Sequence, residues 1–68
     1  MKKYITWLKS QGFKFQYRGL PASNCYTIRT VEVMGEKYKC IILGPGKDFG
    51  LAHSYMYFNS KGKLVAHK

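Results

Sequence analysis

Acidic residues are scarce in this 68-residue sequence, where Glu32, Glu36 and Asp48 stand against twelve lysines and arginines. Residues 1–31 contain six basic residues and no acidic one, and the formal net charge is +9. A small domain charged in this way attracts polyanions before any specific contact forms. The composition therefore favours a nucleic-acid partner or an acidic protein surface.

Long apolar runs are also missing. No stretch approaches the roughly 20 apolar residues of a membrane-spanning helix, so we expect no membrane insertion. The apolar run near the start is interrupted at Thr6 and ends at Lys9. It is shorter than the roughly 7–15 apolar residues of a secretory signal core. We expect a cytoplasmic location, in which Cys25 and Cys40 are free thiols.

Cysteine and histidine are sparse and widely spaced. Cys25, Cys40, His53 and His67 include no pair at the close spacing of structural zinc sites. The three acids form no evident acid–base pair. The Gly-Pro-Gly-Lys sequence at 44–47 lacks the Ser or Thr that follows the lysine of a phosphate-binding P-loop. The sequence predicts no cofactor, no metal and no enzymatic activity.

Aromatic residues, by contrast, are abundant, with six Tyr, four Phe and one Trp. Apolar residues make up 46% of the chain, enough for a modest core, and the length predicts one domain over residues 1–68. A core of this size has no room for every ring. Some tyrosines should therefore lie at the surface, where their hydroxyls tolerate water.

Hydrophobic periodicity predicts a helix followed by strands. Residues 2–11 have the spacing of a short amphipathic helix that Gly12 ends. Residues 13–17 alternate as a half-buried strand, and hairpins follow over 25–43 and 55–67. The expected fold class is α+β in the order α-β-β-β-β. One short N-terminal helix packs on one face of a small, mainly antiparallel four- to five-stranded sheet.

Turn residues predict the register of both hairpins. A first turn at Gly35-Glu36 gives the pairs Val33–Tyr38, Glu32–Lys39 and Val31–Cys40. In the second hairpin, a type I turn with Gly62 in a bulge pairs Asn59 with Lys63 and Phe58 with Leu64. The predicted faces of this hairpin are Met56, Phe58, Leu64 and Ala66 on one side, and Tyr55, Tyr57, Lys63, Val65 and His67 on the other.

Rings on an open sheet face, flanked by basic residues, can stack on unpaired bases. We expect the helix to cover the side of Val31, Val33 and Phe58, which leaves tyrosines among lysines on the other side. Alternatively the tyrosines only pack across strands. In either case Ile28, Ile41 and Leu43 on the same face indicate that part of it is covered by a loop or by a second subunit, which allows a homodimer. The predicted nucleic-acid-binding residues are Lys2, Lys3, Lys9, Lys14, Arg18, Tyr26, Lys37, Lys39, Tyr55, Tyr57 and Lys63.

The first functional hypothesis is therefore a small, non-enzymatic domain that binds RNA or DNA through a basic, tyrosine-bearing surface. The second is a protein-binding inhibitor or adaptor, encoded by a phage or mobile element, that docks on an acidic surface of a host protein. In that case Ile28, Ile41, Leu43 and the tyrosines form the docking patch.

A third hypothesis comes from a resemblance. The opening helix, Gly12-Phe13 and the strand that follows resemble the HicA-type messenger-RNA interferase toxins over roughly residues 1–45. The resemblance implies a fold like that of double-stranded-RNA-binding domains, and RNA cleavage by a histidine near the start of the second strand. Here Ser23, Asn24 and Cys25 occupy that region, and a hairpin replaces the family's final helix. The chain would then be an RNase relative without the expected catalytic His.

Overall fold

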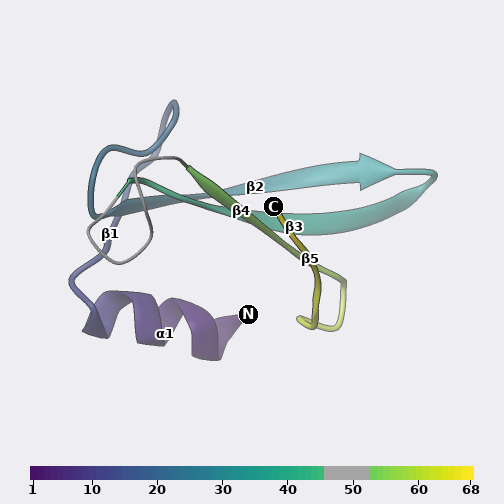
Figure 1. The fold of residues 1–68 in the computed structure, drawn as a ribbon. Coiled ribbons are helices and arrows are strands. Elements are labelled where there is room, and N and C mark those ends of the chain that lie inside the picture. Colours follow the sequence, from purple (N-terminus) through teal and green to yellow (C-terminus); the bar gives the residue numbers. More distant parts are fainter. Residues whose placement is uncertain (46–52) are drawn as a thin grey trace.

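One helix and a five-stranded sheet make up the fold (Figure 1), which confirms the predicted α+β class. The computed structural model describes residues 1–45 and 53–68, so most of the predicted glycine-rich loop lies outside the described residues. The strands lie in chain order, with β1 parallel to β2 and every other neighbouring pair antiparallel. The elements are α1 (Lys2–Ser10), β1 (Lys14–Phe15), β2 (Cys25–Val33), β3 (Glu36–Leu43), β4 (Ser54–Phe58) and β5 (Leu64–His67).

The helix ends as its sequence predicts. Gly12 has a φ of +90° and donates its N–H to the Lys9 carbonyl at 3.1 Å, while Phe13 donates to the Leu8 carbonyl at 3.0 Å. These two bonds form a Schellman motif, which satisfies carbonyls that the last turn would otherwise leave open. The accompanying apolar contact is also present, because Leu8 and Phe13 both belong to the core. The described residues contain no helix long and apolar enough to cross a membrane.

The core lies between α1 and one face of the sheet. Leu8 and Phe13 pack there with five sheet residues, and the ring of Tyr4 lies 6.0 Å from that of Phe58. The predicted choice of face was right for Phe58 and wrong for the first hairpin, because the helix covers the side of Ile41 rather than that of Val31 and Val33. The sheet residues of the core are Tyr26, Ile41, Leu43, Met56 and Phe58.

The first hairpin turns one residue earlier than predicted. Met34 and Gly35 have φ values of 50° and 82°, so both central residues are left-handed, as a type I′ turn requires. A left-handed backbone is uncommon for methionine, and the sequence therefore favoured a turn centred on Gly35 and Glu36. The register moves by two residues, a shift that keeps every side chain on its predicted face. The observed pairs include Val31–Tyr38, Glu32–Lys37 and Arg29–Cys40.

The second hairpin follows its prediction at the turn and departs from it further along. Phe58 pairs with Leu64, and Asn59 donates its N–H to the Lys63 carbonyl at 2.9 Å. An irregularity between Tyr57 and Phe58 then places Ala66 opposite Tyr57. Ala66 therefore shares the face of Tyr57 instead of the predicted face of Phe58. A bulge of this kind changes the side on which the following residues point.

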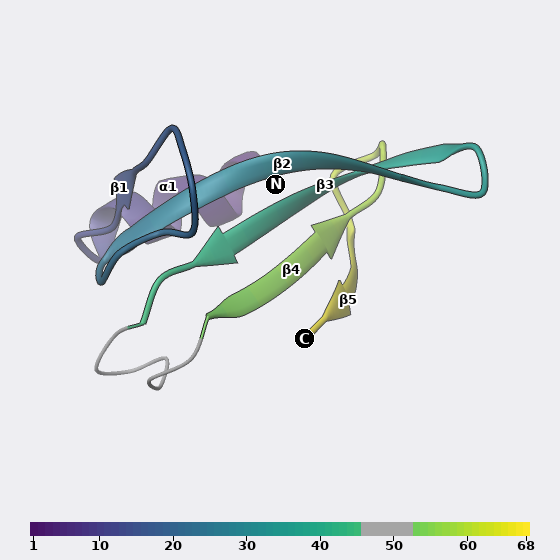
Figure 2. The same cartoon turned by 90° about the horizontal axis from the view of Figure 1, so that it is seen from above.

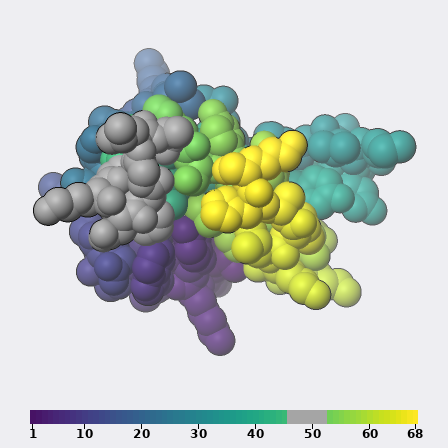
Figure 3. Space-filling view, in the orientation of Figure 1, coloured from purple at the N-terminus to yellow at the C-terminus, as the bar shows by residue number. Residues whose placement is uncertain are grey.

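Pairing of β3 with β4 joins the two hairpins. Cys40 pairs with Tyr57 and Lys39 with Phe58, which is the last pair before β4 ends. Residues 31–38 continue past β4 and β5 as a two-stranded arm (Figures 2 and 3). The sheet thus has a broad part backed by α1 and a narrow part that projects from it.

Gly44, directly after β3, offers a direct test of how closely its backbone approaches that of Ala22, before β2. Its N–H bonds to the Cys25 carbonyl at 2.8 Å, and a Cβ at this position would run into the backbone carbonyl of Ala22. We expect Gly44→Ala to lower the free energy of unfolding by about 3 kcal/mol, measured by urea denaturation.

Gly19→Ala is the matched control. Gly19 has a φ of +70° and open space around it, so the added methyl costs only the left-handed strain of about 1 kcal/mol. A Gly44→Ala chain as stable as the Gly19→Ala chain would contradict the close approach of the two backbones.

Candidate nucleic-acid interface

Three tyrosines share the sheet face that α1 leaves open. Tyr57 stands in a cross-strand row with Arg29, Cys40 and Ala66. Tyr55 is bonded to Lys68 of the neighbouring segment through both backbone groups, at 2.9 and 2.8 Å. Strand alternation places a third ring on the same face. We call this set, Tyr38, Tyr55 and Tyr57, the tyrosine face; all three side chains are half-buried.

This face differs from the predicted one in one ring and in its cations. Tyr26 is only 2% exposed and belongs to the core, so its predicted role in stacking is wrong. Tyr38 takes its place, while the predicted Tyr55 and Tyr57 remain. Lys37 and Lys39 lie on the other side of the sheet, and exposed Arg29 and Lys68 border the tyrosine face instead.

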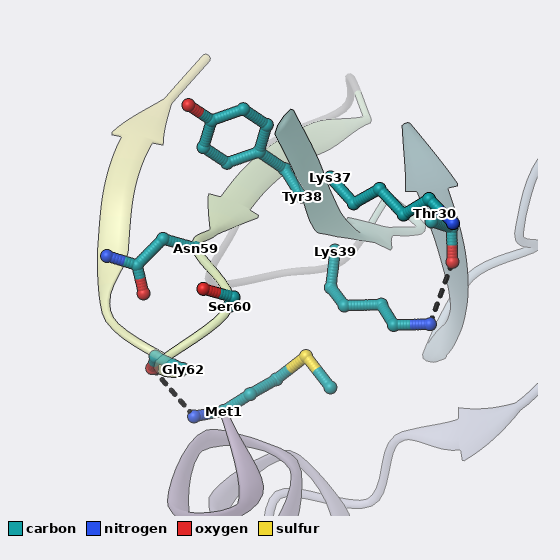
Figure 4. Close-up of a pocket in the computed structure, with 8 residues that line it drawn as sticks. All are labelled: Met1, Thr30, Lys37, Tyr38, Lys39, Asn59, Ser60 and Gly62. Carbon is teal, nitrogen blue, oxygen red and sulfur yellow. Dashed lines mark hydrogen bonds between the residues drawn. The ribbon is translucent and has the colours of Figure 1, made fainter. Parts of the chain in front are cut away.

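The two lysines line a groove of about 520 Å³ on the helix side (Figure 4). The N-terminal ammonium donates to the Gly62 carbonyl at 2.9 Å, and Lys39 Nζ donates to Thr30 Oγ1 at 2.7 Å. These bonds hold two positive charges at the groove without neutralising either one. We call it the basic groove; its lining residues, none acidic, are Met1, Thr30, Lys37, Tyr38, Lys39, Asn59, Ser60 and Gly62.

Tyr38 connects the basic groove with the tyrosine face. It also lines a second hollow of about 330 Å³, together with Tyr57 and Val31. Its hydroxyl donates to Glu36 Oε2 at 3.1 Å, and this hydrogen bond and the charge of Glu36 raise the pKa of Tyr38. Because β4 ends opposite Lys39, no described strand pairs with Tyr38 on the side away from β2. One side chain therefore borders both a cationic hollow and an apolar one.

Cys40 lies beneath the tyrosine face. Burial raises the pKa of its thiol, and a hydrogen bond from Tyr57 and the positive charge of Arg29 only partly offset this. The pKa of Tyr57 is raised as well, first by the charge that Cys40 would carry as a thiolate. Both groups are therefore neutral near neutral pH, and the face presents uncharged rings.

The other predicted cations are exposed but do not join the basic groove. Lys14 pairs with Cys25 at the start of β2, whereas Lys37 pairs with Glu32 near its end. Lys14 therefore lies at the opposite end of β2 from the basic groove, whereas Lys2 and Lys63 adjoin Met1 and Gly62 of its lining. Those outside the groove lining are Lys2, Lys3 and Lys9 on α1, Lys14 on β1, Arg18 in the following loop and Lys63 before β5.

The two histidines lie apart, His53 just before β4 and His67 on β5. His53 Nε2 lies 2.8 Å from the Pro21 carbonyl oxygen, to which it donates, since a carbonyl can only accept. His67 is on the edge strand β5, opposite Met56. Within residues 1–45 and 53–68, no three His, Cys, Asp or Glu side chains are grouped so that they could hold a metal ion.

No protein-family model, curated protein or solved structure matches the chain. The resemblance to HicA-type toxins therefore rests on residue pattern alone. The closing hairpin of β4 and β5 stands where that family has its final helix.

Thiol reactivity tests the packing beneath the tyrosine face. Cys40 is 2% exposed with a raised pKa, whereas Cys25 is half-buried. At about pH 8 we expect iodoacetamide to alkylate Cys40 roughly tenfold or more slowly than Cys25, because only the accessible thiolate reacts. Peptide mass spectrometry over time measures both rates. Equal rates in the native chain would contradict this packing, while equal rates in denaturant are the expected control.

Proposed function

We propose that this chain is a non-enzymatic domain that binds single-stranded nucleic acid. The basic groove holds phosphates, and the tyrosine face stacks on the bases that follow. The observation that carries the proposal is the position of Tyr38, which lines both hollows and so lets one strand pass from the first to the second.

The groove suits a phosphodiester because its lining contains cations and no acid; Glu36 lies beside Lys37 and Tyr38, outside that lining. Lys37, Lys39 and the N-terminal ammonium approach it from β3 and from the start of α1. Ammonium groups contact phosphate as point charges and do not read sequence. The net charge of +9 draws the polyanion towards the domain before these contacts form.

The tyrosine face suits bases because its rings stand on a rigid sheet and remain partly open. Tyr55 and Tyr57 are two residues apart on β4, so their side chains emerge about 7 Å apart on the same side. Base–aromatic stacking is tolerant of sequence, since every base has a π face. The proposal therefore predicts weak sequence preference.

Removing one ring should weaken binding. We expect Tyr57→Ala to raise the Kd for an unstructured oligonucleotide by about 5- to 150-fold, the equivalent of roughly 1–3 kcal/mol for one stacked base. Fluorescence anisotropy at about 50 mM salt measures the change.

Tyr17→Ala is the matched control. Tyr17 is 89% exposed and its ring lies 4.9 Å from that of Phe15, outside the tyrosine face. Its loss should leave the Kd unchanged. A wild-type chain that fails to bind at low salt, or equal losses in both variants, would contradict the proposal.

Salt dependence tests the groove separately. On single strands each neutralised phosphate contributes a slope of about −0.7 to log K against log salt. We expect Lys39→Gln to make the slope shallower by about this amount, and Lys14→Gln, at the far end of β2, to change it little. A larger change for Lys14→Gln would place the phosphates on the β1 side instead.

A second candidate function is supported by exposed apolar side chains. Val33 and Met34 at the arm tip are 54% and 98% exposed, and Leu64 and Val65 on β5 are 47% and 51% exposed. We propose as the alternative that the chain is an inhibitor or adaptor for a host protein with an acidic surface, with these residues at the contact. They replace the predicted Ile28, Ile41 and Leu43, which lie in the core or against it. A single protein retained stoichiometrically after nuclease treatment, and lost with Met34→Asp, would favour it.

A further inference from the structure

The outer edge of β2 is unpaired along most of its length. β1 covers only Cys25 and Tyr26, and β2 continues to Val33. Among the described residues, no other strand is hydrogen-bonded to that side of β2 (Figure 2). A strand edge of this kind is a template for another chain.

The hydrogen bonds show which backbone groups face outward. Gln16 donates its N–H to the Tyr26 carbonyl at 2.9 Å, so Tyr26 directs its backbone groups towards β1, while the Cys25 carbonyl accepts from Gly44 on the β3 side. Within an antiparallel strand this direction alternates with each residue. The groups that point outward beyond β1 are therefore those of Ile28, Thr30 and Glu32.

This edge lacks the usual protection against pairing. Residues 27–33 contain no lysine and no proline, the residues that commonly blunt an edge. The opposite edge strand, β5, has only four residues and lies between Lys63 and Lys68. Of the two edges of the sheet, the one at β2 is the one open to pairing.

Charge indicates a second copy of the chain as the partner. Glu32 and Glu36, two of the three acids of the chain, lie here, and they balance Arg29 and Lys37. Residues 28–37 are thus formally neutral, and Lys39, which pairs with Thr30, adds one positive charge beside them. A second copy with a net charge of +9 therefore meets less repulsion at this edge than at the parts of the chain that carry basic residues alone.

We infer that the chain forms a homodimer in which β2 pairs antiparallel with β2 of a second copy. The register that uses all three outward residues of each strand sets Thr30 opposite Thr30 and Ile28 opposite Glu32, with six backbone hydrogen bonds. Val33 of each copy then lies opposite Thr27, just past the end of the other copy's β1.

This register also has consequences for the exposed side chains. Met34 follows Val33 and is 98% exposed, so in the dimer it lies near β1 of the other copy. Phe15 and Tyr17 of that region are themselves 44% and 89% exposed. In this register even-numbered residues lie opposite even-numbered ones, and odd opposite odd. Equivalent faces of the two copies therefore stay together, and both tyrosine faces lie on the same side of one continuous sheet. Thr30 lines the basic groove, so the two grooves meet at the two-fold axis.

Mass in solution tests the dimer. Light scattering and sedimentation should show a concentration-dependent rise from 7.9 kDa towards twice that mass. Thr30→Pro removes the outward N–H without removing a bond to β3 and should yield a monomer. Thr30→Ala is the matched control: it also loses the bond with Lys39 but keeps the N–H, so it should remain dimeric.

A disulfide tests the register even if the proline variant fails to fold. In a Cys25→Ser background, Thr30→Cys places two thiols opposite one another, with Cα atoms about 5.5 Å apart, within disulfide range. Mild oxidation should give a covalent dimer with Thr30→Cys and little with Val33→Cys, whose position does not face itself. A wild-type chain that stays monomeric, Thr30→Pro that remains dimeric, or an extended peptide bound at this edge of a monomer would overturn the inference.

Discussion

The register of β3 is the constraint on which the rest of the structure depends. β3 is hydrogen-bonded on both sides, and its residues from Cys40 to Leu43 are all buried. Alternation directs Ile41 and Leu43 towards α1, and Cys40 and Ile42 towards the tyrosine face. A slip of one residue in β3 would exchange these two sets, moving Ile41 and Leu43 out of the core and Tyr38 off the tyrosine face. The same pairing therefore fixes the core and the candidate interface.

The candidate interface lies where this pairing stops. β4 ends opposite Lys39, while β2 and β3 continue as the arm. Tyr38 is the first β3 residue past that point, and its bond to Glu36 fixes the ring between two hollows. The adjoining groove is closed by the start of α1 and by the turn after β4. Stable pairing thus supplies rigidity, and the end of pairing supplies an accessible surface, as binding to a flexible polymer requires.

Local sequence signals predicted the elements well and their mutual arrangement less well. The helix, its Gly12 end and both hairpins follow from residue type and spacing. The error of two residues in the first hairpin did no harm, because an even shift preserves the faces. Which faces of the two hairpins lie on the same side of the sheet was predicted wrongly, because no turn residue encodes the pairing of β3 with β4. Tyr26 was consequently assigned to the open face and Tyr38 to the covered one, and both assignments were wrong. The basic groove combines residues from both ends of the sequence, so no local pattern could show it.

We propose that one strand of nucleic acid passes from the basic groove over Tyr38 to the tyrosine face. The most direct measurement is an NMR titration of the isotopically labelled chain with a short, unstructured oligonucleotide, followed through its backbone amides. We expect the largest shifts at Tyr38, Lys39, Tyr57 and Asn59, with little change at Tyr17. Shifts confined to α1 and β1, or no shifts at low salt, would contradict it.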